Sequence, residues 1–161
     1  MAIDNVREYL KPFGLDGKIL EFEVSSATVA LAAKALGAEE ARIAKTLSFE
    51  DKEGGCILVV TAGDVKIDNH KFKEHFGFKA KMLSFDDVPV KTGHAAGGVC
   101  PFANPEGTQV WLDESLKRFG TVFPACGSAN SAIELTPDTL FDISHARGFI
   151  DVCKPIAPVA E

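Results

Sequence analysis

The 161-residue sequence lacks the features that would direct it to a membrane or to an oxidising compartment. No apolar run approaches the ~20 residues that a transmembrane helix needs. Residues 1–5 carry an acid where a secretory signal peptide would carry a base. The four cysteines are scattered, with no Cys-x-x-Cys pair and no histidine at ligand spacing, so neither a disulfide framework nor a zinc site is indicated. We therefore expect a cytoplasmic protein with reduced cysteines, no metal ion and no membrane partner.

The sequence also lacks an excess of positive charge and the common motifs for nucleotide cofactors. Its 17 basic and 23 acidic residues give a net charge of −6. This balance argues against generic nucleic-acid binding driven by phosphate contacts, although a local basic patch could still hold the end of an RNA. There is no P-loop, no Gly-x-Gly-x-x-Gly fingerprint and no Ser/His/Asp order typical of hydrolases. No cofactor and no DNA partner are predicted.

The residues that are present have the composition of an ordinary globular domain. Hydrophobic residues make up 46% of the chain and charged residues 25%, and the length fits one domain over residues 1–161. Several strands are expected to be joined directly by hairpins. This favours an α+β fold, in which a mixed, mostly antiparallel and partly barrel-like sheet is covered by helices. The expected strands are 20–24, 43–49, 56–61, 78–82, 108–112, 121–126, 131–135 and 149–152. The expected helices are 6–13, 27–36 after a cap at Ser25 or Ser26, one from Asp68 or Asn69 to Gly77, and one that begins at Thr136-Pro137. The tail 154–158 is expected to be extended.

A glycine-rich stretch from Thr92 to Phe102 reads Thr-Gly-His-Ala-Ala-Gly-Gly-Val-Cys-Pro-Phe. Its glycines allow a tight bend and a close approach by a ligand, and Pro101 fixes the next turn. A plain surface turn is the alternative. Because Val99, Cys100 and Phe102 would be poor choices for a solvated loop, we expect this turn to line a pocket, with His94 near it.

Lys45 is the most unusual polar residue of the predicted strands. The alternation of residues 43–47 places it on the same face as Ile43 and Leu47, which should be buried. A lysine there must find a partner, shift its pKa or reach into a cleft, because an isolated buried ammonium is costly. The alternative is a lysine at a strand edge that extends to solvent.

A second turn of small residues, Cys126-Gly127-Ser128-Ala129-Asn130, lies between two apolar segments. Its backbone amides could bind a carbonyl group. A simple tight hairpin is the alternative, since serine, asparagine and glycine are the usual residues of such turns.

Five segments in order along the chain resemble the YbaK family, which is also called the prolyl-tRNA synthetase-associated or insertion-like editing domain. The resemblance extends over residues ~25 to 150. The segments are Arg42-Ile43-Ala44-Lys45-Thr46-Leu47, Val60-Thr61-Ala62-Gly63-Asp64, Thr92-Gly93 with Gly97-Gly98-Val99-Cys100-Pro101-Phe102, Val110-Trp111-Leu112-Asp113, and Gly127-Ser128-Ala129-Asn130 with Ile133-Glu134-Leu135-Thr136-Pro137.

The resemblance implies a free-standing deacylase that hydrolyses the ester of mischarged tRNA, typically tRNA(Pro) carrying a wrong small amino acid, without a metal ion. The partners would be the acceptor 3′ end of that tRNA and prolyl-tRNA synthetase. Lys45, Gly127 and Ser128 would be catalytic: Lys45 would hold the 3′ end of the tRNA or the reacting ester, and amides of the two glycine turns would bind the aminoacyl carbonyl. Ester cleavage develops an oxyanion, and losing one prepositioned donor typically costs about 10²–10³ in rate. Water or the neighbouring ribose hydroxyl is the expected attacker. The residues expected to bind substrate are Thr46, His94, Gly97, Gly98, Val99, Pro101, Phe102, Ala129 and Asn130.

Two departures from the family pattern leave the amino acid open. The turn 127–130 differs from the Ser-Ala-Gly-Gln type of the branch that removes cysteine, and His94-Ala95-Ala96 replaces an aromatic residue often found after Thr-Gly. Alanine, serine, threonine, cysteine or another small residue would each fit. A competing hypothesis is a non-catalytic module that binds aminoacyl-tRNA-like ligands or a synthetase. Lys45 discriminates the two, because catalysis should need its charge.

Overall fold

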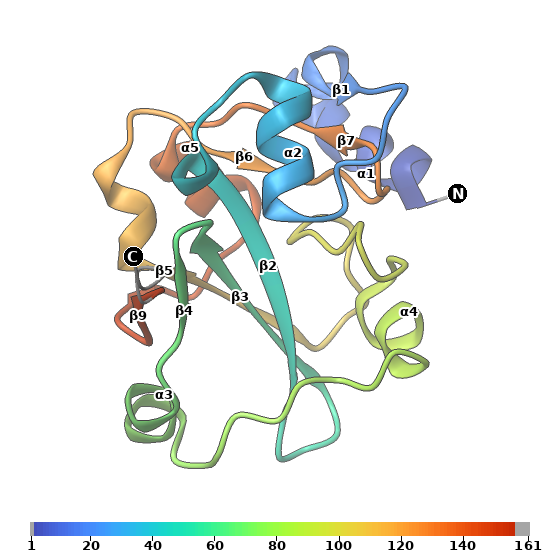
Figure 1. Ribbon diagram of the computed structural model, residues 1–161. Helices are drawn as coiled ribbons and strands as arrows, with labels where there is room; N and C mark the ends of the chain where they lie inside the picture. Colours follow the sequence, from blue (N-terminus) through green and yellow to red (C-terminus); the bar gives the residue numbers. More distant parts are fainter. Residues whose placement is uncertain (1, 157–161) are drawn as a thin grey trace.

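A five-stranded mixed sheet forms the centre of the structure, a computed structural model that describes residues 2–156 (Figure 1). The strand order is β6-β2-β3-β5-β8, with β6 and β8 at the edges. β2 and β3 pair antiparallel as a hairpin, whereas the other three pairs of this sheet are parallel. The bounds are β2 Ile43–Glu50, β3 Cys56–Ala62, β5 Thr108–Asp113, β6 Phe123–Pro124 and β8 Phe149–Ile150.

Two small antiparallel sheets extend this centre. β1 (Leu20–Glu21) pairs with β7 (Ser131–Ala132), and β4 (Val65–Ile67) pairs with β9 (Cys153–Pro155). The expected α+β domain with a mixed sheet is confirmed. In the five-stranded sheet, however, antiparallel pairing is confined to β2 and β3, and among residues 2–156 that sheet stays open at β6 and β8.

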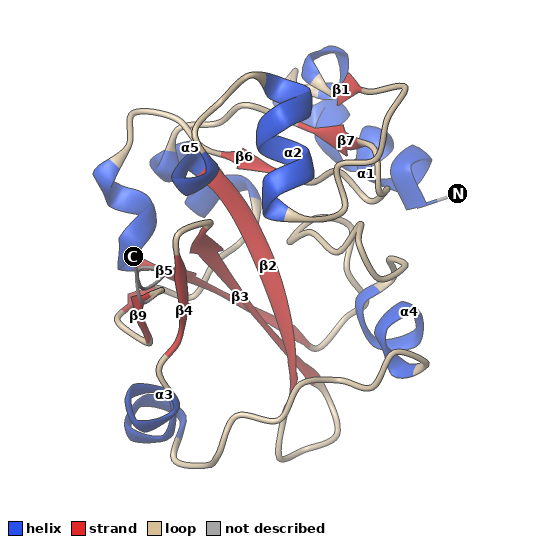
Figure 2. Ribbon diagram, in the orientation of Figure 1, coloured by secondary structure: helices blue, strands red, loops and turns tan. Residues whose placement is uncertain are grey.

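Helices surround the sheet, as the colouring by secondary structure shows (Figure 2). α2 lies beside the first residues of β2, while α3 and α4 appear on opposite sides of the β2–β3 hairpin (Figure 1). None of the helices within residues 2–156 combines the length and apolar character needed to cross a membrane. The α-helices are α1 Ala2–Leu10, α2 Val29–Leu36, α3 Asn69–Phe76, α4 Asp87–Thr92 and α5 Pro137–Ile143, and the 3₁₀ turns are η1 Lys11–Phe13, η2 Asp16–Lys18, η3 Glu40–Arg42 and η4 Glu114–Arg118.

β3 is the centre of the core, as its apolar run predicts. All seven of its residues are buried, and Leu58, Val59 and Val60 have no exposed surface. A strand covered on both faces needs apolar side chains at consecutive positions, which explains the absence of alternation here. Helices α1 and α5 contribute Val6 and Leu140 to the same core.

Two predicted strands are wrong or much shortened. Within residues 20–24 only β1 forms, and Leu20 and Val24 are 43% and 62% exposed, because β1 pairs only with the two-residue β7. Residues 78–82 form no strand: Met82 makes a single bridge to Phe49 and is 57% exposed. Apolar alternation therefore occurs in both segments without a long strand, although Phe22, Phe78 and Ala80 pack against buried residues.

The remaining differences concern helix boundaries and short elements. Thr28, not Ser25 or Ser26, caps α2, because its side chain accepts a hydrogen bond from the amide of Leu31. Helix α4 and strand β4 were not predicted. The segments 121–126 and 131–135 pair over fewer residues than expected, and of the predicted extended tail, residues 157 and 158 lie outside the described residues.

Candidate active site

A cavity of about 340 Å³ opens beside β2, between the start of α2 and the loop of residues 93–101. In Figure 1 this loop lies between α2 and α4. The volume is near the lower end of the range for ligand sites in proteins, so the cavity suits a small ligand. Its walls come from α2 and the residues before it (Ser26, Ala27, Thr28, Val29, Ala32), β2 (Ile43, Ala44, Lys45, Thr46, Leu47, Ser48), the segment leading to α4 and α4 itself (Met82, Val88), the glycine loop (Ala96, Gly97, Val99), and β6, β7 and their connection (Phe123, Ala125, Ser131, Ala132).

One edge of β2 is open where it borders this cavity. β6 pairs with β2 only at Ile43 and Ala44. Further along, the Ser48 carbonyl accepts from the Leu83 amide at 3.1 Å, and the Glu50 amide donates to the Lys81 carbonyl. Within the described chain, residues 45–47 therefore have no strand partner on this edge.

Thr46 has its backbone groups on that open edge. Successive residues of a strand direct their amide and carbonyl to alternate edges, so Thr46 shares the edge of Ala44 and Ser48. The hydroxyl of Thr46 is also buried and has no hydrogen-bond partner among residues 2–156. Because buried polar groups are normally paired, Thr46 has the unused donors and acceptors that a bound ligand could satisfy.

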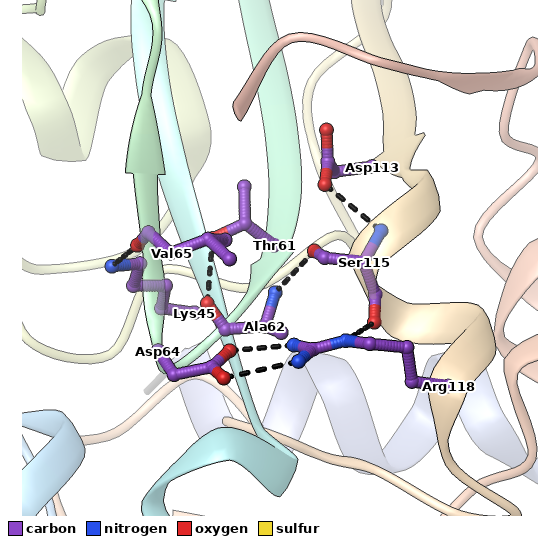
Figure 3. Close-up of polar contacts among 8 residues, drawn as sticks. All are labelled: Lys45, Thr61, Ala62, Asp64, Val65, Asp113, Ser115 and Arg118. Carbon is purple, nitrogen blue, oxygen red and sulfur yellow. Dashed lines mark hydrogen bonds and ion pairs between the residues drawn. The ribbon is translucent and has the colours of Figure 1, made fainter. Parts of the chain in front are cut away.

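Lys45 lies at the mouth of the cavity, half-buried, and its ammonium donates a hydrogen bond to the carbonyl oxygen of Val65 in β4 (Figure 3). Burial lowers the pKa of Lys45, and the negative charges of Cys153, if ionised, and Asp64 partly oppose this. No carboxylate is bonded to Lys45 in the described part of the chain. Its positive charge is therefore available to a ligand.

The turn that places the Val65 carbonyl is held by η4 (Figure 3). Arg118 donates to both carboxylate oxygens of Asp64, at 3.0 and 2.5 Å. The amide of Ala62 donates to the hydroxyl of Ser115 at 3.2 Å. Gly63 is crowded, because a Cβ there would lie 2.0 Å from the carbonyl oxygen of Glu40. The Lys45 ammonium is thus bonded to a turn that these contacts hold, 20 residues away in sequence.

The two predicted glycine turns meet, although about 30 residues separate them. A Cβ on Gly98 would lie 2.8 Å from the Cα and amide nitrogen of Ser128 and 2.9 Å from the carbonyl carbon of Gly127. Gly97 and Gly127 both have positive φ, +89° and +91°, as expected for such turns. The juxtaposition brings together the segments that the sequence analysis singled out separately.

These turns contribute fewer free amides than expected. Gly97 and Val99 line the cavity, but the Gly98 amide donates to the carbonyl of Ala95 at 3.0 Å. The Gly127 amide is directed to the sulfur of Cys100. A Cβ on Gly127 would meet Ala2 and Val6 of α1 at 3.0 Å, so this glycine faces α1.

The segment 128–130 forms hydrogen bonds to residues that line the cavity or precede α2. The Ser128 hydroxyl donates to Ser131, which is a lining residue, at 2.7 Å. The Ala129 carbonyl accepts from the Ser26 amide at 2.6 Å, and the Asn130 side chain donates to the Phe22 carbonyl at 2.9 Å. Hydrogen bonds from this segment therefore fix the residues that lead into α2.

His94, Pro101 and Phe102 do not line the cavity. His94 is 1% exposed, its Nε2 lies 2.7 Å from the Phe102 carbonyl oxygen, and burial lowers its pKa. Phe102 is fully buried in the core and Pro101 is buried beside it. His94 therefore lies buried against Phe102, near the lining residue Ala96, and its expected contact with substrate stays a prediction.

Several lining residues were missed by the sequence analysis. The start of α2 contributes Thr28 and Val29, and the segment before and within α4 contributes Met82 and Val88. The cap pattern before α2 was a usable signal for the first pair. Met82 lies in the segment 78–82, whose alternation predicted a strand, and the sequence analysis assigned no element to the residues around Val88.

The lining of this cavity favours an external nucleophile. In the described chain, its one charged side chain is Lys45; it holds neither a carboxylate, an imidazole nor a thiol that could activate a hydroxyl. Among residues 2–156 no three His, Cys, Asp or Glu side chains converge as metal ligands would. A cation and unpaired strand-edge groups around a small space can bind a carbonyl compound and stabilise negative charge on its oxygen.

The family model for the aminoacyl-tRNA editing domain matches residues 23–143. The chain belongs to this family of YbaK-like editing domains. It is 53% identical over 154 residues to the uncharacterized protein YwhH of Bacillus subtilis (strain 168), an alignment that covers 96% of this chain and 98% of that protein.

Solved structures share the fold. A candidate trans-editing enzyme for prolyl tRNA synthetase is similar with a TM-score of 0.86 and 28% identity, over 95% of this chain and 97% of that one. The hypothetical protein APE2540 is similar with a TM-score of 0.83 and 32% identity, over 93% and 99% of the two chains.

Proposed function

We propose that this protein is an aminoacyl-tRNA deacylase that removes a wrong small amino acid from tRNA, with tRNA(Pro) as the first candidate. The observation that carries the proposal is Lys45, a half-buried cation without a carboxylate partner in the described chain, at the open edge of β2 beside a small cavity. Membership of the editing-domain family supports the ester as the substrate. The structural neighbour, a candidate trans-editing enzyme for prolyl tRNA synthetase, supports tRNA(Pro).

In the proposed reaction the amino-acid side chain occupies the cavity and the ester lies beside Lys45. Water, or the free hydroxyl of the terminal ribose, attacks the ester carbonyl. The Lys45 ammonium and the edge amide of Thr46 stabilise the oxyanion that forms. The bond to the ribose oxygen then breaks and that oxygen takes up a proton; attack by water releases the free amino acid and tRNA directly, and attack by the ribose hydroxyl gives an ester that water must still cleave.

This reaction needs no metal in our proposal, and the lining supplies no metal-ligand cluster within residues 2–156. A substrate made of charged tRNA would place the activity in the cytoplasm. Association with prolyl-tRNA synthetase is a separate proposal, tested by co-sedimentation of the two purified proteins with and without tRNA(Pro).

The test is a panel of tRNA(Pro) species charged with alanine, serine, threonine, cysteine or proline. We expect the protein to release at least one small amino acid and to leave prolyl-tRNA(Pro) intact. Lys45→Ala should remove the activity and Lys34→Ala, an exposed lysine of α2, should not. A Lys45→Ala variant that melts normally and deacylates at the parental rate would show that Lys45 is structural. Tight binding of mischarged tRNA without release would instead indicate the non-catalytic module.

A further inference from the structure

A carboxylate lies close to Lys45 but does not bond to it. Asp64 precedes Val65, whose carbonyl oxygen accepts the hydrogen bond from the Lys45 ammonium. The two charges are near enough to affect each other, because Asp64 opposes the lowering of the Lys45 pKa by burial. Within the described chain the two side chains nevertheless form no ion pair with each other. The carboxylate that could neutralise Lys45 is therefore bound elsewhere.

Arg118 of η4 binds this carboxylate. Its guanidinium donates to both oxygens of Asp64, at 3.0 and 2.5 Å, and Figure 3 shows the carboxylate directed toward Arg118 and away from the Lys45 ammonium. The hydrogen bonds from Arg118 are the main reason that the pKa of Asp64 is lowered. The Nε of Arg118 also donates to the carbonyl oxygen of Ser115, at 2.9 Å, which orients the guanidinium. A paired contact of this kind fixes a carboxylate in direction as well as in distance.

Three titratable groups lie around Lys45 on the neighbouring segments. Asp64 belongs to the turn before β4, and Cys153 to β9. Lys66 of β4 lines a second cavity together with Lys45 and is itself a cation. Burial raises the pKa of the Cys153 thiol, so this thiol is neutral at pH 7. Among these groups Asp64 is therefore the one that could neutralise Lys45.

We propose that Arg118 is a positioning residue, which keeps Lys45 free for the substrate by holding the Asp64 carboxylate. This inference rests on the proposed function, in which the Lys45 ammonium stabilises the oxyanion. Without Arg118, the Asp64 carboxylate would turn to Lys45 as the nearest remaining cation of the site. The resulting ion pair would withdraw from the ester the charge that the reaction needs.

The experiment compares Arg118→Gln, Asp64→Asn and the double variant by kcat/KM for the best substrate of the tRNA panel. Arg118→Gln should lower kcat/KM about five-fold at pH 7, because a partly exposed ion pair shifts an equilibrium by up to about that factor. Asp64→Asn breaks the same ion pair but also removes the competitor, so it should keep most of the parental value. The double variant should recover from the level of Arg118→Gln toward that of Asp64→Asn.

The pKa of Lys45 is a readout that a merely structural ion pair would not move. It is measured by NMR titration of the lysine Cε–Hε signals, with the Lys45 signal assigned by its absence from Lys45→Met. Asp64→Asn should lower this pKa, because it removes a nearby negative charge. Arg118→Gln should raise it, because the carboxylate comes closer to the ammonium. The loss of activity at high pH should shift in the same two directions.

Arg7→Gln is the matched control, because it breaks another exposed ion pair, of 3.1 Å, between α1 and β1. It should change neither kcat/KM nor the pKa of Lys45, and thermal melting checks that every variant is folded. Arg118→Lys keeps the charge and should retain more activity than Arg118→Gln. Equal defects in Arg118→Gln, Asp64→Asn and the double variant would show that the ion pair is only structural and would overturn the inference.

The two readouts separate this inference from the proposed function. If the pKa of Lys45 shifts as expected but the parent cleaves no ester, the deacylase proposal fails and the control of the Lys45 charge by Arg118 stands. If the parent cleaves esters and Arg118→Gln matches it in both kcat/KM and the pKa of Lys45, the inference fails alone.

Discussion

Replacing Gly98 with alanine tests whether the contact between the two glycine turns shapes the active site. The new Cβ would lie 2.8 Å from backbone atoms of Ser128, which cannot rotate away as a flexible side chain would. The gap would have to open from 2.8 Å to at least 3.4 Å for an ordinary contact. Gly98 does not have positive φ, so the cost comes from this contact and not from the backbone conformation.

The expected magnitude follows from known costs of overpacking. Extra volume in a packed site destabilises by about 1–3 kcal/mol. For a protein of this size, each kcal/mol lowers Tm by roughly 2–4 °C, so we expect a decrease of about 2–12 °C. Gly97 and Val99 on either side of Gly98 line the cavity, and a displacement approaching 1 Å costs up to about 100-fold in rate. We expect turnover to fall at least about ten-fold.

The assay combines thermal melting by circular dichroism with single-turnover deacylation at a temperature where the variant is folded. Gly120→Ala is the matched control, because a Cβ there meets no atom within 4 Å and φ is not positive. It should melt within a few degrees of the parent and react at the parental rate. The reasoning would be refuted if Gly98→Ala behaved like Gly120→Ala in both measurements.

Two further substitutions and a labelling experiment test other parts of the structure. Gly127→Ala should lower Tm, because an alanine at φ +91° is strained by about 1–2 kcal/mol and its Cβ meets α1 at 3.0 Å. Its turnover per folded molecule should fall less than that of Gly98→Ala. A larger fall in turnover would mean that this turn borders the substrate. Lys45→Met should raise Tm at pH 7 while removing activity, because burial lowers the pKa of Lys45 and so makes its charged form a cost to the folded state. As pH rises through the lowered pKa of Lys45 toward 10.5, the lysine of the folded parent loses its charge and the parent becomes more stable. The difference in Tm between Lys45→Met and the parent should therefore shrink over this range. A Tm difference that stays constant would contradict the argument. The four buried thiols should react with Ellman's reagent at pH 8 only after unfolding in urea. The reason is that burial raises the pKa of the Cys56 thiol to about 11 and that of the Cys100 thiol to about 12. Fast labelling of the native protein would contradict this, because it would show that a thiol is accessible.

The sequence predicts the centre of the fold well because the signals there are local. The β2–β3 hairpin is marked by a polar turn between two apolar runs, and the unbroken run Ile57 to Val60 identifies the central strand. The cap Thr136 with Pro137 likewise places α5. These signals depend only on residues within a few positions of each other.

The parts that fail depend on contacts between distant segments. Nothing near Gly98 indicates that Ser128 will lie against it, and nothing near His94 indicates that the loop will bury it against Phe102. The alternation at residues 78–82 is local, but whether it forms a strand depends on a neighbour that offers only one bridge, at Phe49. Lys45 was found because a cation in an apolar strand is a local anomaly.

The open edge of β2 bears on how the protein avoids self-association. An unpaired strand edge is a template for another chain and thereby a hazard for aggregation. Here the gap is confined to residues 45–47, with β6 at one end and residues 81–83 at the other. A strand in a sheet usually spans about 5–6 residues, so this gap is too short for a foreign strand to add to the sheet. The edge can therefore remain open to a small ligand without exposing the protein to edge-to-edge assembly.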